Sequence, residues 1–220
     1  MGTTTGQRIA TNTAYLFISQ ILTWGLSLLT AIAVPRFYGA EGIGQYALAG
    51  SLWGITALLI GFGTDVVINR EIARDQNKVN VLVSAGIFQR IIMHLVGFAG
   101  LALFAQIAGY APETIQIIYI FGVANFVYQI GHIFSAALYG LEKMGRLSVV
   151  GFLTELVSTV GILLIIVAGQ SIVVAASVSI LAGILRTVLL LMVLRRTHPL
   201  RVEWDFQRVK WLLREGVSIL

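Results

Sequence analysis

The sequence has no cysteine and few charged residues, and each absence excludes a class of protein. Without cysteine, a chain of 220 residues can form neither disulfide bonds nor thiolate metal sites. Charged residues make up 11% of the chain, against about 25% in an ordinary soluble domain, whereas hydrophobic residues make up 57%. A soluble fold of this length cannot bury that much apolar surface, so we expect an integral membrane protein.

The signatures of soluble enzymes are also absent. The chain contains no P-loop, no Gly-x-Ser-x-Gly elbow and no His-Glu-x-x-His pair. The breaks between its apolar runs are too short for a catalytic domain, and none is rich enough in Asp and Glu to hold a metal ion for sugar transfer. We therefore expect no enzymatic activity, no cofactor and no bound metal.

What the sequence contains is a series of long apolar runs. An α-helix needs about 20 predominantly apolar residues to cross the hydrocarbon core of a bilayer. Six runs reach this length: Ile9–Val34, Ile43–Ile68, Val81–Ala108, Thr114–Leu141, Leu147–Ala168 and Ser171–Leu194. The first two flank a polar break from Pro35 to Gly42 and predict a transmembrane hairpin. Short connections are typical of neighbouring antiparallel helices, so the predicted fold is an all-α integral membrane bundle of six transmembrane helices.

The basic residues predict which side of the membrane each connection faces, because Lys and Arg concentrate in cytoplasmic loops. Twelve of them lie before the first run, in the even-numbered connections or after the last run, whereas the odd-numbered connections contain only Arg36. We therefore expect a cytoplasmic N-terminus. The net charge of +5 follows from this topology, and nucleic acid is not an expected partner.

The C-terminal segment differs from the six-helix region, residues 1–195. Residues 196–215 are polar, and a helix here would place Trp204, Arg208 and Trp211 on one face. This pattern predicts a cytoplasmic linker with a short amphipathic helix in the membrane interface. The apolar residues 216–220 then begin a new run, which we interpret as the start of a truncated seventh transmembrane helix.

Polar residues within the runs recur at helical spacing, which predicts that they face other helices or water instead of lipid. One polar stripe in the first run includes Asn12 and Thr23. Another in the fourth run contains Asn125, Gln129 and His132. Hydrogen bonding between helices is the favoured interpretation of the stripe in the fourth run, and contact with a substrate is the alternative.

Four charged residues also lie within the runs, where an unpaired charge costs at least about 2.5 to 3.5 kcal/mol. Asp65 and Arg90 lie near the cytoplasmic ends of their runs, and Glu155 and Arg186 match each other in depth. We therefore predict two ion pairs, Asp65–Arg90 and Glu155–Arg186. The functional alternative is anion binding by an arginine or proton coupling through a carboxylate.

Three segments resemble those of a known transporter family. Val34–Tyr46 (VPRFYGAEGIGQY) resembles the junction of the first two helices in polysaccharide exporters of the Wzx and teichoic-acid flippase type. Asn69–Arg74 (NREIAR) resembles the cytoplasmic loop after their second helix, and Leu138–Met144 (LYGLEKM) resembles their junction between helices four and five. The segments occur in the expected order. The chain is thereby similar, over its whole length, to members of the multidrug/oligosaccharidyl-lipid/polysaccharide (MOP) superfamily.

This resemblance implies the N-terminal lobe of a two-lobe transporter whose central cavity opens alternately to either side of the membrane. Flippases of this type move undecaprenyl-diphosphate-linked oligosaccharides to the outer leaflet of the cell inner membrane, for polysaccharides such as lipopolysaccharide or teichoic acid. The implied partners are the lipid-linked oligosaccharide, the lipid bilayer, and a polysaccharide polymerase or glycosyltransferases.

The candidate substrate-binding residues are those that can meet a diphosphate with a cation or a sugar with a polar group. They are Arg36, Arg90, Arg186, Asn12, Thr23, Asn125, Gln129 and His132. Two other functions stay open. A MATE-like drug antiporter would couple to cations through Asp65 or Glu155 and would have a mostly acidic cavity. A membrane scaffold of a glycan-assembly complex would have a packed interior without a cavity.

Overall fold

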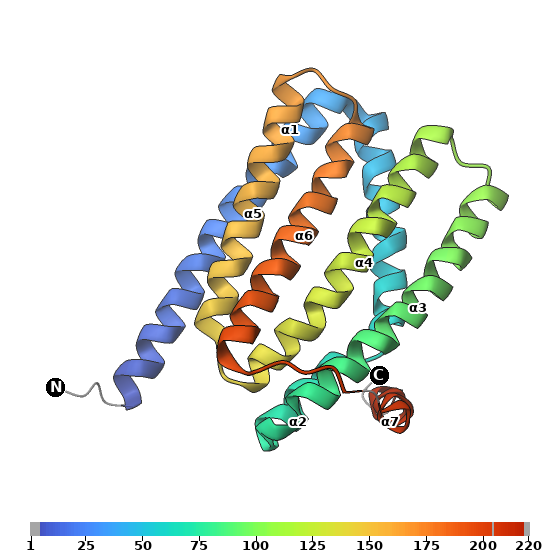
Figure 1. Ribbon diagram of the computed structural model, residues 1–220. Coiled ribbons are helices and arrows are strands. Elements are labelled where there is room, and N and C mark those ends of the chain that lie inside the picture. The colour runs from blue at the N-terminus through green and yellow to red at the C-terminus, as the bar shows by residue number, and fades with distance from the viewer. Residues whose placement is uncertain (1–4, 204, 218–220) are drawn as a thin grey trace.

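The structure, a computed structural model, describes the backbone of residues 5–203 and 205–217 and the side chains of residues 17–203 and 205–217. Within these ranges the chain forms helices and turns, without a β-strand (Figure 1). The elements are α1 (Thr5–Gly61), α2 (Thr64–Arg74), the 3-10 helix η1 (Gln76–Lys78), α3 (Val79–Ile107), α4 (Pro112–Gly140), α5 (Met144–Val167), α6 (Ile172–Thr197) and α7 (Phe206–Val217). The all-α class predicted from the sequence is confirmed for this part of the chain.

Helix α1 contains the first predicted hairpin. Within it only Gly39 leaves helical geometry, with φ 69° and ψ −173°, and the chain reverses direction there. A residue with a Cβ rarely adopts such a φ, which explains the glycine. We call residues 17–38 the first arm of α1 and residues 40–61 the second arm. The predicted break from Pro35 to Gly42 was too long, since all of it except Gly39 is helical.

Five helical stretches are long and apolar enough to span a membrane in the part of the chain that the structure describes. They are Phe17–Gly61, Gln76–Ile107, Pro112–Gly140, Met144–Val167 and Ile172–Thr197. The first, of 45 residues, includes both arms of α1, for which the apolar runs predict two separate spans. Helices α3 to α6 begin and end within three residues of the predicted runs.

The second predicted run, Ile43–Ile68, does not form one helix. It is interrupted at Phe62 and Gly63, whose φ values are 48° and 66°, and α2 begins at Thr64. Two successive left-handed residues cannot continue a right-handed helix, so the second arm ends there. Asp65 consequently belongs to a separate short helix.

A buried hydrogen-bond network holds this interruption in place. The side chain of Arg90 on α3 is 1% exposed, and it donates to Asp65 Oδ1 of α2 at 2.6 Å. It also donates to Gln129 Oε1 of α4 at 2.7 Å. Gln129 donates in turn to the carbonyl of Ala57 in the second arm, at 3.2 Å. One guanidinium therefore connects α2, α3 and α4 around the end of α1.

The backbone carbonyls at the interruption also have partners. Gln89 Nε2 donates to the carbonyl of Ile60 at 2.8 Å, and Thr64 Oγ1 donates to that of Gly61 at 2.7 Å. Gly61 lies against Arg90, since a Cβ on Gly61 would be 3.0 Å from a guanidinium nitrogen. Unpaired backbone groups are costly in an apolar environment, and these side chains satisfy two of them.

The same end of the bundle, opposite Gly39, carries a second ionic cluster on α2. The Glu71 carboxylate, 11% exposed, lies 3.4 Å from Arg70 Nε, 3.3 Å from Arg74 Nη1 and 3.2 Å from Lys78 Nζ. Burial alone would raise the pKa of this carboxyl. The hydrogen bond from Lys78 and the charges of the three cations outweigh that effect and hold the pKa below its ordinary value.

Helix α7 packs against both α2 and α3. An ion pair of 3.2 Å joins Glu215 to Arg70 of α2. Gly216 lies so close to the Phe62 carbonyl oxygen that a Cβ at this position would collide with it. The C-terminal turn of α7 therefore sits directly on the interruption between α1 and α2.

Helix α7 lies where the sequence predicts a short amphipathic helix, with Val209 and Leu212 buried. Arg208 lies over the ring of Trp211 at 5.4 Å. The third residue of the predicted face, Trp204, lies outside the described residues. Of the segment predicted to start a seventh span, residues 216 and 217 end α7 and residues 218–220 lie outside the described residues.

We expect Arg90→Ala to destabilise the fold, because it leaves Asp65 and Gln129 without their donor. The expected loss is about 3 kcal/mol, the lower end for breaking a buried charge pair, since Asp65 is 39% exposed. The measurement is the unfolding temperature of the purified protein in detergent. Arg36→Ala, at an exposed position, is the control, and a variant at Arg90 that unfolds at the wild-type temperature would contradict the proposed role of the network.

Glu71→Gln should lower stability at neutral pH by about 1 to 3 kcal/mol, because three cations lose their shared carboxylate. Since the pKa of Glu71 is lower in the folded state, its contribution exists above the ordinary value of 4.5 and is lost as the pH falls through the folded-state pKa. Thermal unfolding between pH 7 and pH 4 measures this. Glu142→Gln, at an exposed position, should keep the acid-dependent loss that Glu71→Gln removes; equal profiles for the two variants would refute the assignment.

Candidate functional site

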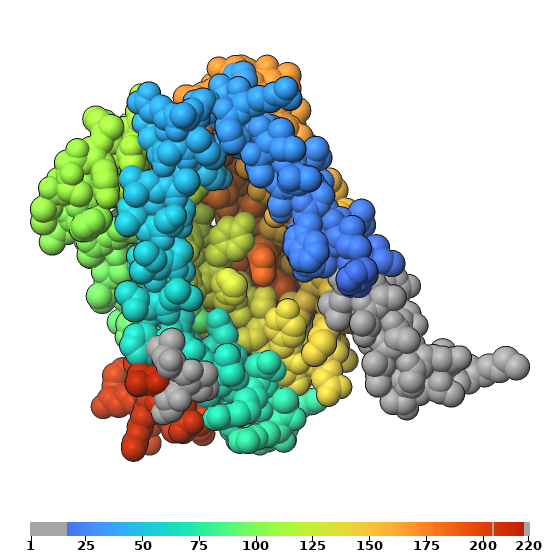
Figure 2. All heavy atoms as spheres, turned by 180° about the vertical axis from the view of Figure 1, so that it is seen from behind, coloured from blue at the N-terminus to red at the C-terminus, as the bar shows by residue number. Residues whose placement is uncertain are grey.

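A cavity of about 660 Å³ lies beside the first arm of α1 and is bounded by α4, α5 and α6. In Figure 2 the hollow is visible between the two arms of α1, with the other helices behind it. Its polar lining residues are Ser19, Gln20, Thr23, His132, Ser135, Tyr139, Ser148, Glu155 and Arg186. Several intramembrane polar groups thus face one shared space.

Two smaller pockets adjoin this cavity because they share lining residues with it. One of about 160 Å³ shares His132, Ser135 and Tyr139 and adds Asp65 of α2. The other, of about 290 Å³, lies between α1 and α5 and shares Glu155. Polar surface therefore extends from α2, past α4, to the contact between the first arm and α5.

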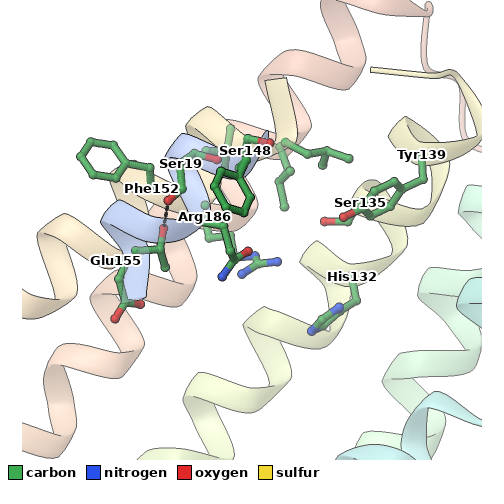
Figure 3. A pocket seen from close by; sticks show the side chains of 15 residues that line it. Ser19, His132, Ser135, Tyr139, Ser148, Phe152, Glu155 and Arg186 are labelled. Atoms are coloured by element: carbon green, nitrogen blue, oxygen red, sulfur yellow. Dashed lines mark hydrogen bonds between the residues drawn. The ribbon is translucent and has the colours of Figure 1, made fainter. Parts of the chain in front are cut away.

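Close packing of α4 against α6 positions Arg186, the one arginine among the residues that line the main cavity. Its guanidinium carbon lies 5.9 Å from the centre of the Tyr128 ring, which rests on Gly183 one turn away. Thr187 Oγ1 donates to the carbonyl of Val127 at 2.8 Å and ties the two helices together. Figure 3 shows the guanidinium directed into the cavity, between the α5 wall and His132.

The predicted ion pair between Glu155 and Arg186 does not form. Both residues line the cavity, but no ion pair of Glu155 occurs within the described ranges, and its Oε1 accepts a hydrogen bond from Ser27 Oγ at 2.7 Å. Figure 3 shows the carboxylate turned away from the guanidinium. Equal depth on neighbouring helices did not suffice, because the two side chains leave their helices in different directions.

Asp65 and Arg90, the other predicted partners, lie 2.6 Å apart. Arg90 and Gln129 are buried in the network around Gly61 and do not line the main cavity. Asp65 is partly exposed and reaches the small pocket beside His132. Arg90 of α3 and Gln129 of α4 thus hold helices together and do not form part of the wall of the main cavity.

The structure places the remaining candidates in different surroundings. Thr23 and His132 line the cavity, as Arg186 does. Arg36 is exposed beside Gly39, at the end of the bundle opposite α2. Asn125 is partly buried, and its Oδ1 has no hydrogen-bond partner among the described residues. The side chain of Asn12 lies outside the described residues.

Sequence reasoning missed several residues that line the cavity. Ser135 and Tyr139 follow His132 at i+3 and i+7, and Ser148 precedes Glu155 by seven residues. These are spacings of one helical face, so extending the polar stripe from His132 would have found the first two. A hydroxyl alone is a weak indication, because Ser and Thr in apolar helices commonly bond to their own backbone, as Ser148 does to the Met144 carbonyl.

This arrangement suits an anionic ligand that also carries hydroxyl groups. An arginine fork can hold phosphate oxygens through two parallel hydrogen bonds, and the hydroxyl side chains can exchange hydrogen bonds with a sugar. The cavity volume lies within the range of about 300 to 1,000 Å³ typical of ligand pockets. Its interior lies among the membrane-spanning helices, where a low dielectric strengthens the attraction between opposite charges.

Comparison with known proteins identifies the family. No curated protein and no solved structure matches the chain. A family model described as polysaccharide biosynthesis protein matches residues 9–220. The chain therefore belongs to the polysaccharide biosynthesis protein family, which comprises MOP-type polysaccharide and O-antigen flippases and whose members are transporters instead of enzymes.

Proposed function

We propose that this chain is the N-terminal lobe of a flippase that moves undecaprenyl-diphosphate-linked oligosaccharide across the cell inner membrane by alternating access. The observation that supports the proposal is the cavity, in which Arg186 forms no ion pair with a carboxylate among the described residues and which hydroxyl side chains also line. Within the lobe, Arg186 contacts the diphosphate, and Thr23, Ser135 and Tyr139 face the first sugar.

The charge of the ligand matches that of the site. A diphosphate diester carries two negative charges, and a guanidinium that packs over an aromatic ring can still form a bidentate pair with one phosphate. His132 lies on the facing wall, where a further hydrogen-bond donor can reach the same headgroup. In lipid-facing surroundings the diphosphate would lose its hydration without compensation, so it requires such a lined cavity to cross.

The proposed topology counts the two arms of α1 as separate spans and gives six in residues 1–195. Arg70 of α2, Lys143 before α5 and Arg196 in the last turn of α6 belong to the end of the bundle opposite Gly39, whereas Arg36 lies beside Gly39. The positive-inside rule then places the N-terminus and that end in the cytoplasm. Residues 196–215 form the cytoplasmic linker, with α7 at the interface. Ser148, near the start of α5, lines the cavity, so substrate would enter it from the cytoplasmic leaflet.

Two alternatives make different use of the same features. A scaffold requires a packed interior, and the cavity of about 660 Å³ counts against it. A MATE-like drug antiporter is favoured by one observation, the absence of a cationic partner for Glu155 within the described ranges. Arg186 in the same cavity would repel a cationic drug. If expressing the chain protected cells from cationic drugs and left the surface glycan unchanged, the antiporter would be favoured.

We expect Arg186→Ala to reduce flipping about 10- to 100-fold, because a charge-assisted hydrogen bond to phosphate contributes about 1.5 to 3 kcal/mol. Lipid-linked precursor should accumulate in the inner leaflet while surface glycan is lost. Arg186→Lys keeps the charge but not the fork, so it should retain intermediate activity.

The matched control is Arg196→Ala, an exposed arginine at the end of the same helix. It should leave export unchanged, and both variants should be present in the membrane at wild-type levels. Unchanged export in a well-expressed Arg186→Ala variant would overturn the role of Arg186.

A further inference from the structure

We propose that α7 binds acidic phospholipids of the adjoining membrane leaflet through a face made of Phe206, Lys210, Leu213, Arg214 and Val217. We call these five residues the exposed face of α7. Binding there is independent of the transported substrate, and only the assignment of the leaflet as cytoplasmic rests on the topology proposed above. The evidence is an exposed apolar strip, its continuity with the lipid-facing surface of α3, and the cations beside it.

Helix α7 has two apolar sides, and one of them packs against the bundle. Val209 and Leu212 are buried on the side that meets α2 and α3. On the exposed face, Phe206 and Val217 are 61% and 56% exposed. At about 100° per residue, Phe206, Leu213 and Val217 fall within about 40° of one another and form a single strip along the helix. Contact with lipid explains such a strip on a helix at the end of a membrane bundle.

The exposed face of α7 continues the lipid-facing surface of α3. Phe206 packs edge-on against Phe88 of α3, with the ring centres 6.4 Å apart. Phe88, Ile92 and Leu95 follow one another at i, i+4 and i+7, which is the spacing of one helix face. Ile92 and Leu95 are exposed apolar residues of a candidate membrane span. Phe206 therefore extends the apolar surface that α3 presents to the acyl chains.

The orientation of α7 suits a helix in the membrane interface. In Figure 1, α3 to α6 run along the plane of the picture, whereas α7 is seen nearly end-on beside the lower part of α3. Helix α7 is therefore roughly perpendicular to the spanning helices and lies along the membrane surface. In this orientation the whole apolar strip can contact lipid at one depth.

Two cations border the apolar strip, on the side away from the buried residues. At about 100° per residue, Lys210 lies about 40° around the helix from Phe206 and Arg214 about 80°. Both cations are exposed, and Lys210 Nζ lies 5.3 Å from the centre of the Phe206 ring. The order of apolar strip and cations matches the order of acyl chains and phosphates in a leaflet. Each such cation strengthens binding to an anionic surface about fivefold.

Charge determines which class of lipid this face prefers. The exposed face contains no carboxylate, and the acidic residues beside it are engaged elsewhere. Glu215 pairs with Arg70 at 3.2 Å, and Asp205 accepts a hydrogen bond from the backbone N–H of Arg208 at 3.1 Å. A zwitterionic lipid carries an ammonium that offsets the attraction of its phosphate for these cations, whereas phosphatidylglycerol carries no such group. The face therefore favours acidic lipid.

Lipid at this face would also stabilise the interruption between α1 and α2. The buried side of the same helix rests there, with Gly216 against the Phe62 carbonyl and Glu215 paired with Arg70. A ligand that binds α7 in its docked position increases the population of that position. Because binding to the folded state raises stability, acidic lipid should raise the unfolding temperature of the chain.

The test uses the purified full chain in micelles of a neutral detergent, with increasing amounts of phosphatidylglycerol or phosphatidylcholine. At equal lipid content, phosphatidylglycerol should raise the unfolding temperature by about 3 °C or more above the value in phosphatidylcholine. Salt at about 1 M should remove most of this difference by screening. Equal responses to the two lipids would overturn the proposal. An equal response to inorganic phosphate alone would assign a site for free anions and overturn it as well.

Variants at Lys210 locate the lipid on α7. Lys210→Gln should raise the amount of phosphatidylglycerol needed for half of the shift about fivefold, and Lys210→Arg should keep the wild-type value because it keeps the charge. The matched control is Arg195→Gln, an exposed cation at the same end of the bundle but on α6, which should respond as the wild type does. A wild-type response in Lys210→Gln would refute the assignment to α7.

Because the chain has no cysteine, one introduced label can report whether the strip lies in lipid. Val217→Cys, carrying a polarity-sensitive fluorophore, should emit at shorter wavelength in vesicles that contain phosphatidylglycerol than in water. Gln76→Cys, at an exposed position of η1 at the same end of the bundle, should keep the emission of a water-exposed dye. The same emission at both positions would show that the strip faces water, contrary to the proposal.

These measurements use no lipid-linked oligosaccharide, so their outcome is separate from that of the proposed function. Arg186→Ala, which changes the cavity, should retain the full response to phosphatidylglycerol. Loss of that response in a folded Arg186→Ala variant would place the lipid in the cavity and overturn the assignment to α7.

Discussion

The buried guanidinium of Arg90 is the constraint on which the arrangement of this lobe depends. It lies where the second arm of α1 ends, and its bonds to Asp65 and Gln129 join three helices around two left-handed residues. The interruption lets α2 leave the direction of the second arm, which places Asp65 beside the cavity and Glu71 in its cationic cluster. Helix α7 rests on the same interruption, so the C-terminal segment depends on it as well.

Within a membrane, the partners of a charged side chain indicate whether its role is structural or is to bind a ligand. Arg90 and Arg186 are both cations within apolar helices, yet Arg90 is 1% exposed and paired, whereas Arg186 faces a cavity with an aromatic ring as its described neighbour. The two carboxylates differ in the same way: Asp65 is paired with Arg90, whereas Glu155 forms no ion pair within the described ranges. Because burying an unsatisfied charge is costly, a charge that the protein satisfies is explained by architecture, and one that it leaves open indicates a ligand of opposite sign.

The sequence predicted the elements better than the contacts between them. Long apolar runs set the ends of α3 to α6 within three residues, because a bilayer demands a nearly fixed length. The end of the second arm was missed, since Phe62 continues the apolar run and only its backbone departs from a helix. Depth along the membrane can be counted in residues, whereas rotation about the helix axis depends on packing. For that reason Asp65 and Arg90 were paired correctly, but Glu155 and Arg186 were not.

The separation of Glu155 from Arg186 has an electrostatic consequence for transport. In a shared low-dielectric cavity, the negative charge of Glu155 weakens the attraction of Arg186 for a diphosphate, even without direct contact.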